Sequence, residues 1–442
     1  MENTAENRQP LSFPAFYAKE SQIPFFVMLG LFALSNMLLV INFTPEAAEL
    51  VGKARLAINT LLLWLCPMYF AFNLIMWRMK PWTVAVGVAS IAGVFAVWNL
   101  LGGYVELFCT VVAAFLALLA YRRDYRTVLQ IFLVAHLVTI LAAVAGLKIG
   151  YAVPRYKLGT QDFGVSLGLI YPNHLGRMVF IVLVLAWYLW GQKRRALTTA
   201  VFWVTAVVMW QWVKCKTIAL FMVAFPVCWW ATTLLLLTQR RMQTQPLRRG
   251  LHRVWNALMI AMPFLMLAFT YAMGRQKIWL DAHYSFGTAA YSLAMRFISA
   301  GILFQVYGFP LWGRDILNET APMEFMNNHI YTADVVDNAY IYYMIALGGI
   351  ALVIVLAWLC LANARMVREG DHALLLISVF MLAYGLIEIV AFQFEHNFIW
   401  FYPLAATAAA AAIPPAGAPG PDTQGPPEPE APAAPPDEAA DA

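Results

Sequence analysis

Two arginines stand inside long apolar stretches of this chain. Arg177 lies in "SLGLIYPNHLGRMVF" and Arg296 lies in "AYSLAMRFISAGILF". An arginine among apolar side chains is costly in a membrane, and those that are kept there usually serve a function. A guanidinium group is always charged and can bind two anionic oxygens at once. Both residues are therefore candidates for binding an anion, unless Arg177 extends to the membrane interface and Arg296 lies on a surface helix.

Two further polar residues, Asn173 and His174, stand between Pro172 and Arg177. The spacing of four residues predicts that Asn173 and Arg177 share one face of a helix. The alternative is a helix kinked at Pro172, in which Asn173 and His174 bind the carbonyl groups that the proline frees.

Asp337 and Asn338 open the apolar stretch "VVDNAYIYYMIALGGIALVIVLAWL". A carboxylate at the edge of the hydrocarbon is costly when it is unpaired. Asp337 could cap the helix that follows, because a helix N-terminus needs a hydrogen-bond acceptor. The position of this pair at the exit of a long connection favours a functional site instead.

Basic residues also stand beside other apolar stretches. Lys214 and Lys216 lie in "WVKCKTIALF", Arg275 follows an apolar stretch, and Arg314 stands next to Asp315. Lysines at helix ends commonly extend to the interface, and Arg314 could form a local ion pair.

The composition indicates a membrane protein. Of the 442 residues, 62% are hydrophobic and 12% are charged, and the mean hydropathy is +0.67. In soluble domains, about a quarter of the residues are charged. The five cysteines form no C-x-x-C motif, so neither a disulfide framework nor a zinc site is indicated. The net charge of +5 fits basic cytoplasmic loops and does not indicate binding to nucleic acid.

The hydropathy pattern predicts an all-α polytopic membrane protein with about 12 transmembrane helices of ~20 residues each. The predicted spans are 24–43, 57–77, 82–101, 104–121, 127–147, 166–190, 196–213, 217–238, 254–273, 338–361, 372–391 and 397–413. Basic residues concentrate in short connections such as "YRRDYR" and "GQKRR", which places both termini in the cytoplasm. The cations at 214, 216, 275 and 296 then lie on the outer side, which this rule depletes of basic residues, and Arg177 lies within a span.

This pattern divides the chain into three parts. Residues 1–23 form a cytoplasmic N-terminal segment, and residues 24–412 form the transmembrane domain. That domain includes an external loop, 275–336, between spans 9 and 10, which is rich in aromatic residues and predicted to fold as short helices on the outer face. Residues 413–442 form a Pro/Ala-rich acidic tail that is predicted to be disordered in the cytoplasm.

Three motifs resemble those of Wzy-type polymerases of bacterial capsule, O-antigen and exopolysaccharide repeat units. The motifs "SLG…PNHLG", "AMRF…FQVYGFPLWGRDI" and "DNAYIYYMIALGGIAL" occur in the order found in that family, and the resemblance covers about residues 120–400. The stretch "VKCKTIAL" is similar to a Ser-Arg-Thr stretch of such polymerases, with Lys216 in place of the arginine. The related O-antigen ligases usually have His-Asn where this chain has Asp337-Asn338.

The resemblance implies a glycosyltransferase that acts on undecaprenyl-pyrophosphate-linked oligosaccharides, both as donor and as acceptor. The residues expected to bind the pyrophosphate and the substrate are Arg177, Arg296, Lys216, Lys214, Arg275, Asn173 and His174. Asp337 is the first candidate for the base that deprotonates the acceptor hydroxyl, His329 is its rival, and Asn338 would orient the acceptor. Asp334 and Asp337 are too few ligands to indicate Mg²⁺ or Mn²⁺, so transfer without a metal or other cofactor is expected.

The same resemblance implies the cytoplasmic (inner) membrane of a bacterium, contact with the lipid bilayer, and flippase and chain-length regulator proteins as partners. Two alternatives stay open. One is an O-antigen ligase or O-oligosaccharyltransferase, which differs in its acceptor. The other is a flippase or transporter of lipid-linked oligosaccharides, although such carriers often have two related halves and this chain shows none.

Overall fold

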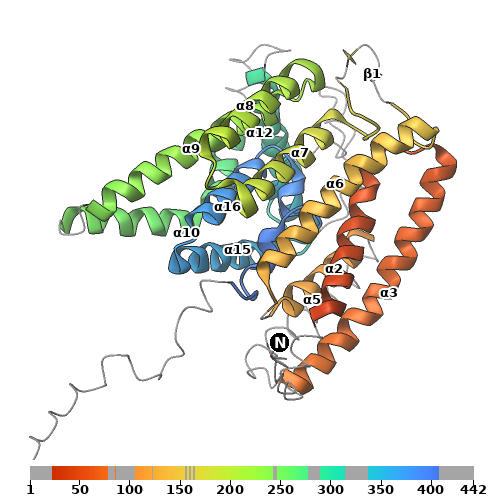
Figure 1. The fold of residues 1–442 in the computed structure, drawn as a ribbon, viewed down its shortest axis with the longest axis horizontal. Coiled ribbons are helices and arrows are strands. Elements are labelled where there is room, and N and C mark those ends of the chain that lie inside the picture. The colour runs from red at the N-terminus through yellow and green to blue at the C-terminus, as the bar shows by residue number, and fades with distance from the viewer. Residues whose placement is uncertain are drawn as a thin grey trace, which may run out of the picture. The chain divides into compact units, whose positions relative to one another are not determined.

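The computed structural model describes residues 22–77, 85, 105–121, 123–154, 157–158, 161–162, 165–241, 246–276, 289–313 and 337–407. This part of the chain is mostly helical, which confirms the all-α class (Figure 1). The helices are α2 (Gln22–Met37), α3 (Pro45–Trp77), α5 (Val105–Leu119), α6 (Tyr125–Ile149), α7 (Pro172–Ala186), α8 (Arg195–Val208), α9 (Lys216–Arg241), α10 (Pro246–Arg275), α12 (Ala289–Tyr307), α14 (Ala339–Leu347), α15 (Gly349–Glu369) and α16 (His372–Tyr384). Two-residue strands, β1 (Lys157–Leu158) and β2 (Gln161–Asp162), pair between α6 and α7.

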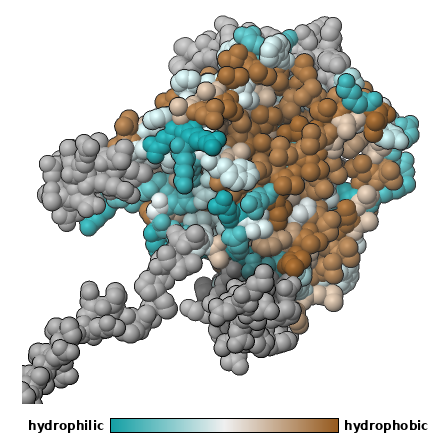
Figure 2. Space-filling view, in the orientation of Figure 1, coloured by the Kyte–Doolittle hydropathy of each residue, from teal (hydrophilic) through white to brown (hydrophobic). Residues whose placement is uncertain are grey.

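Within the described ranges, eight helical segments are long and apolar enough to cross a membrane. They are Gln22–Val40, Pro45–Asn73, Tyr125–Ile149, Pro172–Gly191, Arg195–Val213, Lys216–Leu234, His252–Arg275 and Gly349–Glu369. Large apolar side chains are exposed along them; Trp64, for example, is 68% exposed. Figure 2 shows the wide apolar surface that results, which is costly in water and fits a bilayer. The chain is therefore a multi-pass membrane protein; apart from Ala85, its predicted span 82–101 lies outside the described residues.

The bundle has two ends, which the contacts between its connections define. At the first end, the Ala406 amide donates to the Arg123 carbonyl just before α6, and the Tyr188 hydroxyl donates to Asp371 just before α16. At the second end, short bridges join the α2–α3 connection to residues 152 and 169, close to the end of α6 and the start of α7. The starts of α7, α9 and α14 also lie at this second end, which we call the site end.

Helices α14 and α15 are separate, so the prediction of one span over residues 338–361 is wrong. Gly348 lies between them with φ +91, a conformation that favours glycine. A Cβ at Gly348 would lie 2.5 Å from the Leu311 carbonyl oxygen. The chain after α12 fills this break, and the Gly349 amide donates to the Pro310 carbonyl at 2.8 Å. The nine-residue α14 therefore forms its own short element at the site end.

After α16 the chain runs from the site end back to the first end as residues 386–406, which we call the return segment. It contains only short 3₁₀ turns, η5 (Ile389–Phe392) and η6 (Phe398–Phe401), so the predicted helical span 397–413 is wrong over its described part. Non-helical backbone at membrane depth needs hydrogen-bond partners within the protein. Here side chains supply them: the carbonyls of Leu386, Ile387, Phe398, Trp400 and Tyr402 accept from Asn338, Arg296, Tyr125, Trp358 and Arg365, respectively.

Candidate functional site

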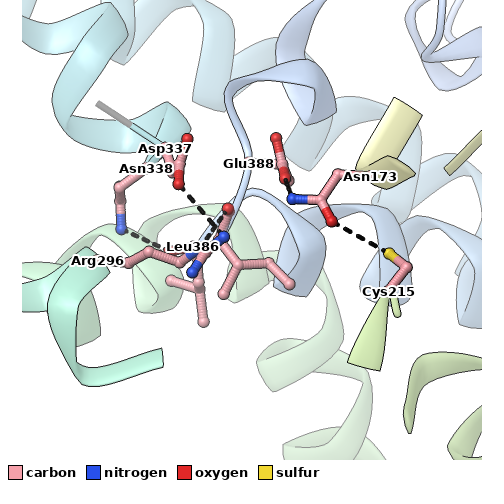
Figure 3. Close-up of polar contacts among 8 residues, drawn as sticks. Asn173, Cys215, Arg296, Asp337, Asn338, Leu386 and Glu388 are labelled. Carbon is pink, nitrogen blue, oxygen red and sulfur yellow. Dashed lines mark hydrogen bonds and ion pairs between the residues drawn. The ribbon is translucent and has the colours of Figure 1, made fainter. Parts of the chain in front are cut away.

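Polar side chains from several helices meet at the site end, beside the start of the return segment (Figure 3). We call them the polar cluster: Asn173, Arg177, Cys215, Arg296, Asp337, Glu388 and His396. They come from α7, the connection before α9, α12, the connection before α14, and the return segment. The cluster therefore depends on contacts between residues that are as many as 219 positions apart in the chain.

The start of α7 positions the first of these side chains. Pro172 is the first residue of the helix rather than a kink within it, because its missing N–H costs nothing at that position. One residue later, the Asn173 amide donates to the Glu388 carboxylate at 3.2 Å and accepts from the Cys215 thiol at 3.3 Å. Arg177 lies one turn further along, within electrostatic range of Glu388. Both side chains thus face the return segment, as their spacing predicts.

Gly176 allows α7 to lie against the start of α9. A Cβ at this position would lie 2.7 Å from the Cys215 sulfur and 3.2 Å from the Cys215 Cβ. Any larger residue at 176 would push apart the two elements that supply Asn173 and Cys215.

We expect Gly176→Ala to lower the unfolding temperature, since overpacking of this kind costs about 1–3 kcal/mol. Adding Cys215→Ala should recover part of the loss by removing the sulfur. Gly52 in α3 is the matched control, because a Cβ there meets no atom within 4 Å. Thermal unfolding of the purified variants measures all three; Gly176→Ala at wild-type stability would contradict the close approach.

Arg296 joins Asp337 to the return segment. Its Nη2 lies 3.2 Å from the Asp337 carboxylate, and its Nε donates to the Ile387 carbonyl at 2.8 Å. The Arg296 side chain is 13% exposed and the Asp337 side chain is 38% exposed, so the aspartate is the more accessible partner of the pair. Arg296 is thus not a solvated residue on a separate surface helix.

Asn338, and not Asp337, caps α14. The Asn338 side-chain oxygen accepts from the amides of Tyr340 and Ile341, and its NH₂ group donates to the Leu386 carbonyl at 3.0 Å. The hypothesis that Asp337 serves as the cap is therefore wrong. Asn338 is 1% exposed, and both its side-chain oxygen and its NH₂ group are bound to other parts of the chain. It therefore has no free polar group with which to orient an acceptor, the role expected for it.

A chain of hydrogen bonds runs from Arg177 into the bundle. Arg177 Nη2 lies 3.3 Å from His396 Nε2, His396 Nδ1 lies 3.3 Å from His136 Nε2, and His136 Nδ1 lies 2.7 Å from the Phe132 carbonyl. The Arg177 guanidinium can only donate, so His396 accepts on Nε2 and carries its proton on Nδ1. That Nδ1–H donates to His136 Nε2, so His136 carries its own proton on Nδ1 and donates it to the Phe132 carbonyl. Both histidines are therefore neutral, and His396 presents a lone pair to Arg177.

Arg177 is a buried cation without an ion-pair partner among the described residues. It is 2% exposed, and its Nε has no hydrogen-bond partner among the described residues. Nor does any carboxylate in the described ranges lie within ion-pair distance of it. Burying a cation without an ion-pair partner costs several kcal/mol, and the nearby carboxylates of Glu388 and Glu395 offset part of that cost.

Glu388 is the cluster residue that the sequence analysis missed. It lies in the turn after α16, outside the membrane-spanning helices, and is partly exposed. Burial, and then the nearby Asp337 carboxylate, raise the pKa of Glu388 to about 7. Burial also raises the pKa of Asp337, while Arg296 lowers it. The signal was available, since Glu388 falls inside the predicted span 372–391, where a carboxylate is costly.

Of the other predicted site residues, His174 lies within electrostatic range of Arg177 and His396, and the rest are exposed or lie outside the described ranges. Lys214, Lys216 and Arg275 are exposed, and Lys216 lies over the Trp210 ring. His174 packs against Tyr171, and its buried Nδ1 has no hydrogen-bond partner among the described residues. Residues 314–336, with Arg314, His329 and Asp334, lie outside the described residues, as do 1–21 and 408–442.

No group of three or more His, Cys, Asp or Glu residues that could hold a metal occurs in the described part of the chain. Comparison with known proteins gives no match: no protein-family model fits the chain, and no curated protein and no solved structure is significantly similar.

Proposed function

We propose that this protein polymerises undecaprenyl-pyrophosphate-linked oligosaccharide repeat units by glycosyl transfer to a sugar hydroxyl. The observation that carries the proposal is Arg177, a buried cation with an unused Nε and no carboxylate partner among the described residues. A pyrophosphate is the kind of ligand that would complete this site, because a guanidinium binds phosphate oxygens in pairs. The resemblance of three motifs to repeat-unit polymerases supports the same reaction.

The transfer develops negative charge on the pyrophosphate as its bond to the sugar breaks. Cations held in place before the reaction stabilise that charge, and they do so best where water is excluded. Arg177 is held by His396, and Arg296 is held by Asp337 and the Ile387 carbonyl. Both arginines lie within electrostatic range of Glu388, so both serve one site.

The acceptor hydroxyl must also lose its proton. Asp337 is the first candidate from the sequence for this step, His329 is its rival, and the polar cluster adds Glu388. Each carboxylate could act only if the sugar hydroxyl reaches it within hydrogen-bond distance.

We place the reaction at the external face of a bacterial cytoplasmic membrane. Basic residues such as Arg126, Arg365 and Arg368 lie at or near the end of the bundle opposite to the site end. Since basic residues concentrate on the cytoplasmic side, the site end would face outward.

A deletion strain tests the proposal. We expect its surface glycan to keep single repeat units and to lose long chains when it is separated as a length ladder on a gel. Accumulation of lipid-linked polymer would instead indicate a ligase, whose acceptor is not another repeat unit. Loss of repeat units from the outer side altogether would indicate a flippase. The wild-type gene, reintroduced on a plasmid, should restore the full ladder.

A further inference from the structure

The polar cluster contains two carboxylates in different surroundings. Asp337 is paired with Arg296 at 3.2 Å. Glu388 has no ion-pair partner in the described ranges and accepts one hydrogen bond, from Asn173 to its Oε1 at 3.2 Å. Two acidic groups that are held differently at one site are suited to different tasks.

The hydrogen bonds leave Glu388 free to accept a proton. Its second carboxylate oxygen, Oε2, has no hydrogen-bond partner in the described part of the chain, whereas the Asp337 carboxylate is held by a cation. Glu388 is also partly exposed, so a hydroxyl group can approach it. The amide of Asn173 in turn fixes the carboxylate through Oε1.

The charged groups around Glu388 shift its pKa in opposite directions. The titratable groups that face it are Arg177 on α7, Cys215 before α9, Arg296 on α12, Asp337 before α14 and Tyr384 on α16. Asp337 raises the pKa of Glu388, and the two arginines lower it. The pKa of about 7 that results suits a base that works near neutral pH.

We propose that Glu388 accepts the proton of the acceptor hydroxyl, with Asp337 as its electrostatic partner; this inference rests on the function proposed above. In the transfer, the hydroxyl oxygen forms the new bond to the anomeric carbon of the donor. The bond from that carbon to the pyrophosphate oxygen breaks, and undecaprenyl pyrophosphate leaves with the electron pair. The hydroxyl proton moves to Glu388 and is later released to water, so no oxidant or reductant is needed.

Glu388→Gln is the direct test, because glutamine keeps an oxygen for the Asn173 hydrogen bond but accepts no proton. With purified enzyme and lipid-linked repeat units from the deletion strain, we expect the rate to fall by roughly 10²-fold or more. The wild-type rate should decline as the pH falls through about 7, since the base becomes protonated. The residual rate of Glu388→Gln should lack that decline. A variant with the wild-type rate and the wild-type pH profile would overturn the assignment.

Asp337→Asn gives a second test that does not require Glu388 to change. Removing the Asp337 charge lowers the pKa of Glu388, so the decline in rate with falling pH should move to lower pH. An unshifted decline would overturn the electrostatic role, and a loss of activity equal to that of Glu388→Gln would assign the proton to Asp337. If the wild-type enzyme makes no polymer from repeat units, the proposed function itself fails, which is a different outcome from either variant result.

Discussion

Arg177→Ala is expected to abolish long glycan chains while the protein is still made and folded. The alanine removes the buried guanidinium that the proposed pyrophosphate would meet, and losing one preorganised charge of this kind costs on the order of 10²–10³-fold in rate. Arg177→Lys should recover little of this, because an ammonium group cannot bind two phosphate oxygens in parallel. The rate with purified lipid-linked repeat units and the chain-length ladder in cells measure the effect.

His396 offers a matched test of how Arg177 is held. His396→Gln keeps a hydrogen-bond acceptor for Arg177 and should retain more activity than His396→Leu, which keeps none. Lys53, an exposed cation paired with Glu49, is the control for loss of a positive charge, and Lys53→Ala should leave the ladder unchanged. Wild-type chain length in Arg177→Ala would remove this residue from the site.

Arg296→Ala is expected to reduce both stability and activity. It leaves Asp337 without its cation and the Ile387 carbonyl without its donor, and the unpaired carbonyl alone costs about 1–3 kcal/mol. It also removes the second guanidinium from the site, so we expect the rate to fall by roughly 10²-fold or more.

The double variant Arg296→Ala with Asp337→Asn separates these two effects. Removing both partners of the ion pair should recover part of the unfolding temperature, because no buried charge is left alone. The rate should nevertheless stay low, since the proposed donor still lacks its cation. Recovery of the rate to the level of Asp337→Asn would show that Arg296 only holds the aspartate.

Local spacing was enough to predict part of this site. Four residues separate Asn173 from Arg177, which fixes their shared face whatever the rest of the fold does. The membrane setting likewise follows from long apolar stretches. Arg296 was identified because a guanidinium among apolar residues is costly, but its pairing with Asp337 depends on how α12 crosses the start of α14. That crossing is a tertiary contact, which no local pattern encodes.

Other features were missed for the same reason. A hydrophobic run predicts one helix over 338–361, but it cannot show that the chain near Pro310 inserts at Gly348 and ends the first helix there. The pattern also cannot distinguish a helix from the return segment, whose apolar residues are equally buried. His136 and His396 are separated by 260 positions, so their contact could be seen only in the folded bundle.

The return segment has a consequence for the order in which this protein is assembled in the membrane. Its carbonyl groups are satisfied by side chains of α6, α12 and α15 and by Asn338, all of which are synthesised earlier. Released alone into lipid, the segment would expose those carbonyls where no water can bind them. We therefore expect it to enter the membrane after the helices whose side chains bind these carbonyls have been inserted. The turn with Glu388 is part of this late piece, so the polar cluster is complete only when membrane insertion is complete.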